Sequence, residues 1–188
     1  MASEKEADRG RRADEARHLA LASAWPRALI EAGLAEEITE DWLVRVDRAV
    51  EAGHPNWPRF ALDPSLADGL FEVRRARRVV RGLDAVEEAL DREKAGLQRA
   101  AATRPKGRRI SRLLLLGADG SARFYRQAER VQQEHLDRLA VAIIEADEEG
   151  LGAALFGPGK RARAVMVDHK DAVIAILDRL RGQAPWNA

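Results

Sequence analysis

The sequence has no cysteine, which excludes disulfide bonds, thiolate metal sites and cysteine nucleophiles. Aromatic residues make up only 5% of the 188 positions, and few stand among the basic residues, which disfavours a platform that stacks single-stranded bases. No apolar run approaches the ~20 residues that cross a bilayer, and the charged N-terminus lacks the apolar region of a secretory signal. These absences predict a soluble, cytoplasmic protein without a membrane partner.

The balance of charges is nearly neutral, although charged residues are abundant. Acidic and basic residues make up 34% of the chain, but the formal net charge is only +1. The whole molecule is therefore not a polycation, and any attraction to nucleic acid has to come from local clusters of basic residues. Hydrophobic residues make up 46% of the chain, which is enough to bury a sizeable core.

The first part of the chain has a helical pattern. Residues 1–12 are polar and charge-rich, and we expect a mobile charged tail there. In residues 13–78 apolar side chains recur at helical spacing, as in TEDWLVRVDRAVEAG, where Thr39 is a suitable N-cap and Gly53 a suitable stop. The segment GHPNWPRFALDPS contains three prolines and is expected to form a loop. Residues 13–78 are therefore predicted to form a helical N-terminal region.

The apolar pattern changes at Ile110. ISRLLLLGAD is a short, continuous apolar run followed by turn residues, which is typical of a strand buried on both faces. Two further apolar runs, RLAVAIIEAD and RARAVMVD, alternate with helical stretches, the first of which Ser121 is expected to cap. This alternation predicts an α/β fold for residues 79–188, with a small, mostly parallel sheet in a three-layer arrangement.

Three stretches resemble one known family. VVRGLDAVEEALDREKAG (Val79 to Gly96), LLLLGAD and EEGLGAALFGPGKRARAVMVD (Glu148 to Asp168) are similar to the kink-turn RNA-binding ribosomal protein superfamily, in matching order. The resemblance covers about Val79 to Arg181 and implies an α/β fold that binds structured RNA. In the family, Asn and Glu of a Gly-X-Asn-Glu turn read the RNA. This chain has Asp84 and Ala85 at that turn, so the family's RNA-reading residues are not retained.

Two segments are rich in basic residues. RRARRVVR, Arg74 to Arg81, has five arginines in eight residues, and RPKGRRISR, Arg104 to Arg112, has five basic residues in nine. Side by side they would form one positive patch for phosphates, whereas pairing with nearby acids would make them a mixed ionic surface. The candidate nucleic-acid-binding residues are Arg74, Arg75, Arg77, Arg78, Arg108, Arg109, Lys160 and Arg161.

The segment GPGKR, Gly157 to Arg161, contains the Gly-Lys pair of a nucleotide-binding phosphate loop. Such a loop needs a Ser or Thr after the Lys and leads from a strand into a helix. Here no hydroxyl follows Lys160, and a helix leads into a strand, so a nucleotide-hydrolysing loop is excluded. We expect a helix-ending turn with Gly157 in the left-handed conformation. The alternative is an anion-contacting loop in which Lys160, Arg161 and Arg163 act as point charges.

Acids and one histidine follow the predicted strands. Asp119 ends the first strand, and Asp168 and His169 end the third, where open α/β sheets place their ligands. They are candidates for a cleft, with His169 as a general base and the carboxylates as magnesium ligands. Helix capping explains the same acids more simply. Because no nucleophile stands nearby and the four histidines lack ligand-like spacing, we predict no catalytic residue, cofactor or metal site.

These observations favour a non-enzymatic binding protein that contacts structured RNA or a ribonucleoprotein through an arginine-rich patch. The alternative is a protein-interaction or scaffold module whose helical N-terminal half binds a partner or a second copy of the chain. A small α/β enzyme with a cleft at the strand ends has the least support, because the sequence contains no combination of nucleophile, base and orienting residue.

Overall fold

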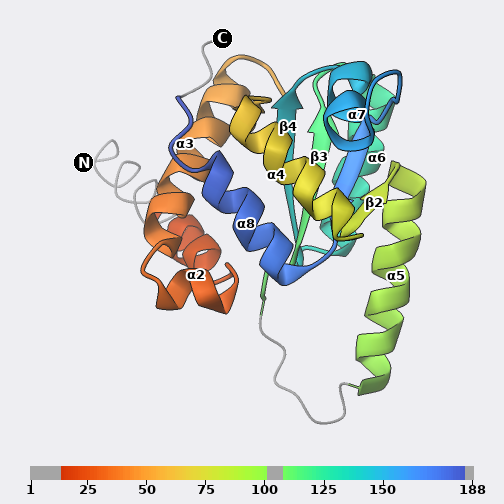
Figure 1. Ribbon diagram of the computed structural model, residues 1–188. Coiled ribbons are helices and arrows are strands. Elements are labelled where there is room, and N and C mark those ends of the chain that lie inside the picture. The colour runs from red at the N-terminus through yellow and green to blue at the C-terminus, as the bar shows by residue number, and fades with distance from the viewer. Residues whose placement is uncertain (1–13, 101–107, 185–188) are drawn as a thin grey trace.

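The computed structural model describes residues 14–100 and 108–184 (Figure 1). A helix over residues 14–22 comes first, and no helix within the described ranges is long and apolar enough to span a membrane. The labelled elements, in chain order, are α2 (Arg27–Glu31), α3 (Ala35–Glu51), β1 (Arg59–Ala61), α4 (Pro64–Arg75), β2 (Val79–Arg81), α5 (Leu83–Ala100), β3 (Arg112–Gly117), α6 (Ala122–Glu134), β4 (Leu139–Glu145), α7 (Glu148–Phe156), β5 (Ala164–Val167) and α8 (Lys170–Leu180).

The strands form one five-stranded sheet in the order β1-β4-β3-β5-β2. β1 and β3 are parallel to β4, whereas β5 is antiparallel to both of its neighbours, β3 and β2. Four strands of this sheet therefore point in one direction, and the predicted α/β fold with a mostly parallel sheet is confirmed. β5 is reversed because α7 and the segment after it stay at the carboxyl end of β4, so the chain re-enters the sheet from that end.

Two short strands extend the sheet beyond the three that the apolar runs predict. β1 lies in the proline-containing segment that we expected to be only a loop, and that expectation is wrong at Arg59–Ala61. Proline is tolerated there because β1 is an edge strand, and the carbonyl of Pro58 accepts a hydrogen bond from the amide of Ile143. β2, at Val79–Arg81, forms the opposite edge.

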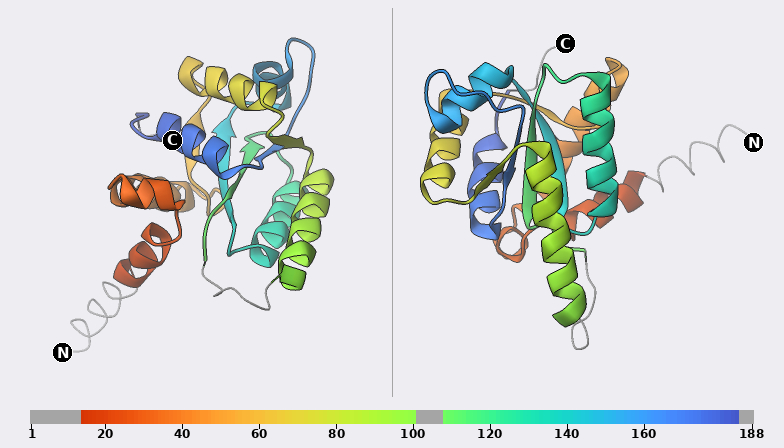
Figure 2. Two further views of the ribbon diagram at one scale, coloured as in Figure 1. Left: turned by 60° about the horizontal axis from the view of Figure 1, so that its bottom comes forward. Right: turned by 90° about the vertical axis from the view of Figure 1, so that its right-hand side faces the viewer.

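Helices cover both faces of the sheet (Figures 1 and 2). Leu113 and Leu115 of β3 belong to one buried cluster together with residues of α3, α4 and α8. Leu114 and Leu116 point to the other face and pack with residues of α5 and α6. This alternation explains why the run is continuously apolar, since each face of the strand is buried under helices. The structure thus has the predicted three layers.

The N-terminal helices pack against the same core as the sheet. Trp25 lies 5.3 Å from Trp42 between ring centroids, and Trp42 lies 5.8 Å from Phe60 of β1. The indole of Trp25 donates a 2.9 Å hydrogen bond to the hydroxyl of Thr39. The expectation that Thr39 is an N-cap is wrong, because α3 begins at Ala35 and Thr39 lies buried inside the helix. The buried cluster therefore contains residues from both predicted regions, 13–78 and 79–188. The predicted tail at residues 1–12 lies outside the described residues.

Candidate nucleic-acid interface

Basic side chains flank both ends of the edge strand β2. Arg74 and Arg75 end α4, Arg77 and Arg78 form the turn into β2, and Arg81 ends the strand. Arg81 is paired in register with Val165 at the start of β5, directly after the loop that carries Lys160, Arg161 and Arg163. We call this set the basic edge; its members are Arg74, Arg75, Arg77, Arg78, Arg81, Lys160 and Arg161.

The end of α4 presents three arginines to solvent. Arg74, Arg75 and Arg77 are exposed, and none of them has an ion pair or side-chain hydrogen bond among the described residues. The amide of Arg77 donates to the carbonyl of Arg74, and that of Arg78 donates to Val73. This pattern closes a helix with its next residue in the left-handed conformation, and Arg77 has a φ of 56°. An arginine thus stands where glycine is the ordinary choice.

Arg78 is held against the start of α8. Its guanidinium lies 2.8 Å from Nδ1 of His169 and 3.9 Å from the carboxylate of Asp171. The same Nδ1 accepts a 3.3 Å hydrogen bond from the amide of Asp171, which makes His169 the N-cap of α8. His169 therefore serves as a helix cap and a contact for Arg78.

The loop between α7 and β5 is fixed by a close approach of two backbones. A Cβ added to Gly152 would lie 2.2 Å from the carbonyl oxygen of Lys160 and 2.6 Å from Cα of Arg161. The amide of Ala162 also donates a 2.7 Å hydrogen bond to the carbonyl of Glu148. Because only glycine permits this approach, Gly152 determines where Lys160 and Arg161 are presented. Lys160 is exposed and makes no ion pair among the described residues.

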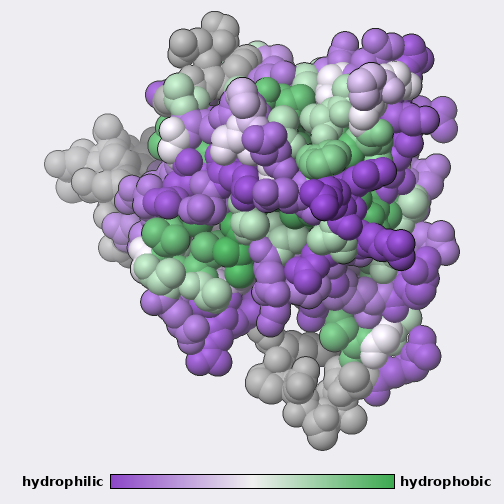
Figure 3. All heavy atoms as spheres, viewed as in Figure 1, coloured by the Kyte–Doolittle hydropathy of each residue, from purple (hydrophilic) through white to green (hydrophobic). Residues whose placement is uncertain are grey.

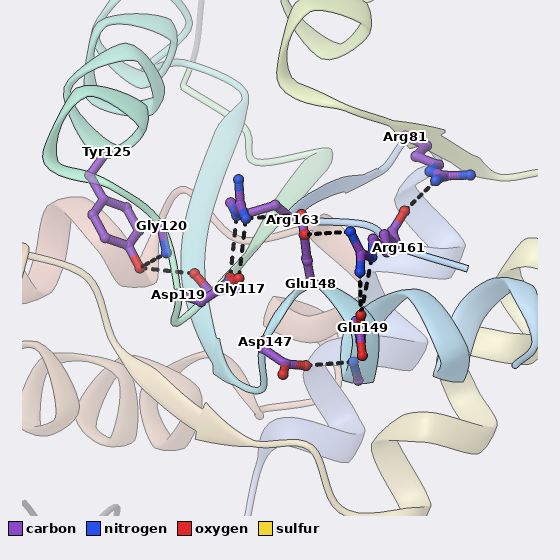
Figure 4. Close-up of polar contacts among 11 residues, drawn as sticks. Arg81, Gly117, Asp119, Gly120, Tyr125, Asp147, Glu148, Glu149, Arg161 and Arg163 are labelled. Carbon is purple, nitrogen blue, oxygen red and sulfur yellow. Dashed lines mark hydrogen bonds and ion pairs between the residues drawn. The ribbon is translucent and has the colours of Figure 1, made fainter. Parts of the chain in front are cut away.

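Arg161 connects this loop to β2 and to α7 (Figure 4). Its carbonyl accepts a hydrogen bond from Arg81, and the Arg81 guanidinium lies 5.0 Å from the ring centroid of Phe156. The guanidinium of Arg161 donates to Glu149 at 2.6 Å. This hydrogen bond raises the pKa of Arg161 above its ordinary value, and Glu148 makes a smaller contribution. Arg161 remains fully cationic, but two acids share its charge.

Arg163 and Asp119 form a second polar cluster beside the loop, which shares Glu148 with Arg161 (Figure 4). Arg163 pairs with Asp119 at 3.3 Å and with Glu148 at 2.9 Å, and the hydrogen bond to Asp119 raises the pKa of Arg163. The hydroxyl of Tyr125 donates to the carbonyl of Gly117 at 2.9 Å, and burial raises the pKa of Tyr125. Arg163 is paired with two acids, so this cluster adds little to the positive surface.

The structure divides the eight predicted basic residues into three groups. Arg74 to Arg78 stand at one end of β2, and Lys160 and Arg161 stand beside its other end. Arg108 and Arg109 precede β3, which is separated from β2 by β5, and Arg108 donates to the carbonyl of Leu136. The one patch that we considered, with both basic segments side by side, stays a prediction for Arg108 and Arg109. Residues 101–107 of that segment lie outside the described residues.

The cleft considered at Asp119, Asp168 and His169 is contradicted by the strand directions. Because β3 and β5 are antiparallel, the residues that follow them lie at opposite ends of the sheet. Asp119 pairs with Arg163 at one end, whereas the amide of Asp168 donates to the carbonyl of Arg78 at the other. A strand-end argument assumes parallel strands, and β5 does not satisfy that assumption.

The turn at Gly157 is confirmed as a helix stop. Gly157 follows the last residue of α7 and has a φ of 91°, which favours glycine. Ser121 caps α6 as predicted, accepting from the amide of Phe124 at 3.3 Å. Arg81, by contrast, is not among the predicted site residues, although it belongs to the same arginine-rich segment. Its contact with the α7–β5 loop depends on the pairing of β2 with β5, which the sequence pattern did not reveal.

The surface has a hydrophilic area beside the basic edge and a separate hydrophobic area. Figure 3 shows strongly hydrophilic side chains where α4 runs towards β2, and a hydrophobic area over α2. The second area includes a hollow lined by apolar side chains, among them Leu19 and Ile30. Leu19 has 65% of its surface exposed, and Ile30 has 40%. The two surfaces are distinct in both position and chemistry.

Comparison with known proteins gives distant similarities only. No family model matches the chain, and no curated protein matches it. Among solved structures, a protein of unknown function from Bacillus halodurans has 18% identity and a TM-score of 0.40, covering 61% of this chain and 97% of that one. A 15.5 kDa RNA-binding protein from Giardia lamblia has 14% identity and a TM-score of 0.39, covering 63% and 82%. An RNA-binding protein is thus among these distant structural neighbours.

Proposed function

We propose that the protein is a non-enzymatic binding protein that contacts the phosphates of structured RNA through the basic edge. The observation that carries this proposal is the end of α4, where three exposed arginines have no acidic partner among the described residues. On an ion-paired surface such side chains would be matched by acids, as they are at Arg27 with Glu31 and at Arg92 with Glu88. Unmatched arginines attract phosphate oxygens and form bidentate hydrogen bonds with them.

The conformation of Arg77 supports the same proposal. A left-handed residue other than glycine costs about 1–2 kcal/mol, and this position in the helix-ending motif ordinarily carries glycine. An arginine that is exposed, without a partner and unfavourable for the backbone has no structural role that glycine would not fill better. Residues kept in such conformations are common at binding sites. We therefore assign Arg77 the central phosphate contact.

The composition of this surface favours structured RNA over a single strand. Phe71 is the exposed aromatic residue of α4, with 45% of its surface accessible, and it stands one turn before Arg74 and Arg75. One aromatic ring cannot stack a series of bases, which single-strand binders require. Arginines along an edge suit instead the backbone of a folded RNA, which proteins recognise by shape and phosphate position.

The proposal is tested by fluorescence anisotropy with a labelled RNA hairpin and the full chain. Replacing Arg74, Arg75 and Arg77 together by alanine is expected to weaken binding at 50 mM salt by roughly tenfold or more, because three phosphate contacts are lost. The matched control replaces Arg48, Arg123 and Arg126, which are also exposed and without an ion pair among the described residues. Equal loss of affinity in both triple variants would show attraction by net charge alone and would contradict the proposal.

The alternative function, a protein-interaction module, stays a prediction. The hollow between the N-terminal helices is the feature that favours it, with a volume of 290 Å³ and an apolar lining that includes Leu19, Ala22 and Ile30. Light scattering after size-exclusion chromatography tests the version in which a second copy binds, and a monomer at high concentration would exclude it.

A further inference from the structure

The helices α5 and α6 lie side by side on one face of the sheet (Figure 2), and polar contacts connect them. Gln127 donates to Asp84 at 2.9 Å, and Arg130 donates to Glu87 at 2.9 Å. At these two levels an acid of α5 has a hydrogen-bond donor on α6. One level further along the pair of helices, the acid is Asp91 and its neighbour is a histidine.

At that level three potential metal ligands converge. One ligand atom each from Asp91, Glu134 and His135 lies within 4.8 Å of the other two. His135 is buried, with 5% of its side chain accessible, and its Nε2 atom has no hydrogen-bond partner in the part of the chain that the structure describes. Oδ1 of Asp91 is 3.3 Å from this nitrogen but is not aligned as a hydrogen bond. A buried ring nitrogen thus faces the Asp91 carboxylate without forming a hydrogen bond, which is unfavourable in itself.

The electrostatics of this place favour a cation. Glu134 is the last residue of α6, whose last turn contains no basic residue, so its carboxylate stands at the negative end of the helix dipole. A second carboxylate, that of Asp91, lies within 4.8 Å of it. Lys94 donates a 3.2 Å hydrogen bond to the main-chain carbonyl of Glu134, and Arg108 donates a 3.1 Å hydrogen bond to that of Leu136. Among the described residues, neither of these cations forms an ion pair with the carboxylate of Asp91 or of Glu134.

We propose that Asp91, Glu134 and His135 bind a divalent transition-metal ion of the zinc type. Zinc binds imidazole nitrogen at about 2.0–2.1 Å and carboxylate oxygen at about 2.0–2.2 Å in a tetrahedral arrangement, so two ligand atoms of one ion lie roughly 3.4 Å apart. The ligand atoms here lie within 4.8 Å of one another, and the separations have to close by at most about 1.4 Å. His135 is fixed by burial, whereas Asp91 and Glu134 are exposed and can rotate towards it.

The ligand types decide which ions fit. An imidazole nitrogen favours zinc, cobalt and related ions over magnesium and calcium, which prefer oxygen ligands throughout. Thiolate ligands are excluded because the chain has no cysteine. Since Asp91 and Glu134 face solvent, water can complete the coordination. An ion in this position would connect α5 to α6, and the proposal does not depend on the basic edge or on RNA binding.

The test is isothermal titration calorimetry of the full chain, without a polyhistidine tag, using zinc chloride. We expect one zinc ion per chain, no displacement by millimolar magnesium, and a rise in Tm of about 5 °C with saturating zinc. Asp91→Asn and Glu134→Gln remove ligands at exposed positions where the fold is not at risk, and each is expected to weaken zinc binding at least about tenfold. His135→Ala is expected to abolish it.

The control is His18→Ala, which removes another histidine that contacts a carboxylate, with His18 Nε2 2.6 Å from Glu36. This variant is expected to bind zinc as the unaltered chain does. Cobalt gives a second readout, because a bound ion with nitrogen and oxygen ligands changes its visible absorption, and Asp91→Asn is expected to remove that change. Absence of zinc binding, or binding that is unaffected by Asp91→Asn and Glu134→Gln, overturns the proposal.

Discussion

The backbone of Arg77 connects a local strain to the proposed function. The residue occupies the position after α4 where the chain turns left-handed, and the side chain has no partner among the described residues. If the arginine is present for RNA, then stability and binding should respond in opposite directions when it is replaced. Few positions in the chain separate these two properties so directly.

Replacing Arg77 by glycine is expected to raise the free energy of unfolding by about 0.5–1 kcal/mol. Glycine relieves the left-handed strain, which is worth about 1–2 kcal/mol, but it also gives the unfolded chain more freedom, which offsets part of the gain. Urea denaturation measures the net change. In the same variant RNA binding is expected to weaken, because the phosphate contact is lost.

Arg77→Ala separates the two effects. Alanine keeps the strained conformation and removes the charge, so binding should fall as in the glycine variant without a gain in stability. The interpretation of Arg77 is wrong if glycine does not stabilise the fold relative to alanine, or if neither variant changes RNA affinity.

At the scale of elements, the contact between α7 and its following loop determines the second half of the basic edge. Gly152 packs directly against the backbone of Lys160 and Arg161, and the amide of Ala162 bonds back to Glu148. The loop has little freedom to move relative to the helix. A substitution at Gly152 therefore displaces two basic residues, Lys160 and Arg161, although Gly152 itself carries no charge.

Gly152→Ala is expected to destabilise the fold by about 2–3 kcal/mol, since the added Cβ would meet main-chain atoms that cannot rotate away. Displacing the loop should also weaken RNA binding. Gly150→Ala is the matched control in the same helix, because its Cβ would meet only side-chain atoms, at 3.3 Å, and a change in stability below about 1 kcal/mol is expected there. Chemical denaturation of both variants provides the comparison, and equal effects would contradict the role assigned to Gly152.

The elements that the sequence predicts well are those with strong patterns. β3, β4 and β5 are continuous apolar runs buried on both faces, and Ser121 and Gly157 act as the expected cap and stop. β1 and β2 are only three residues long, and such short strands depend on pairing with distant residues for their stability. The reversed direction of β5 has the same kind of cause. It depends on α7 and the loop after it staying at the carboxyl end of β4, where β5 then begins.

The candidate sites show a similar division between local and distant information. Clusters within one segment, such as Arg74 to Arg78, are visible in the sequence because neighbouring residues stay neighbours in space. The contact of Arg81 with Arg161 spans 80 positions, and the group formed by Asp91 with Glu134 and His135 joins two helices. Neither has a spacing motif, so only the arrangement of the elements brings them together.

Over the whole molecule the net charge is near zero, but the basic residues without an ion-pair partner are unevenly distributed. Several arginines elsewhere are matched by acids, as in the pairs Arg130 with Glu87 and Arg181 with Glu37. Arg48, Arg123 and Arg126 have no ion pair among the described residues, but they stand on two different helices, α3 and α6. The basic edge retains four exposed cations without a partner among the described residues, namely Arg74, Arg75, Arg77 and Lys160. A protein of this kind should bind RNA through one place on its surface rather than by general attraction.

The salt dependence of RNA binding is the most direct measurement of this account. With the observed association constant plotted against salt concentration on logarithmic axes, four or more phosphate contacts predict a slope of about −3 or steeper. Replacing Arg74, Arg75 and Arg77 by alanine should make the slope shallower by about 2–3 units, while the Arg48, Arg123 and Arg126 control leaves it unchanged. Absence of RNA binding at low salt, or one common slope for all three proteins, would contradict the account.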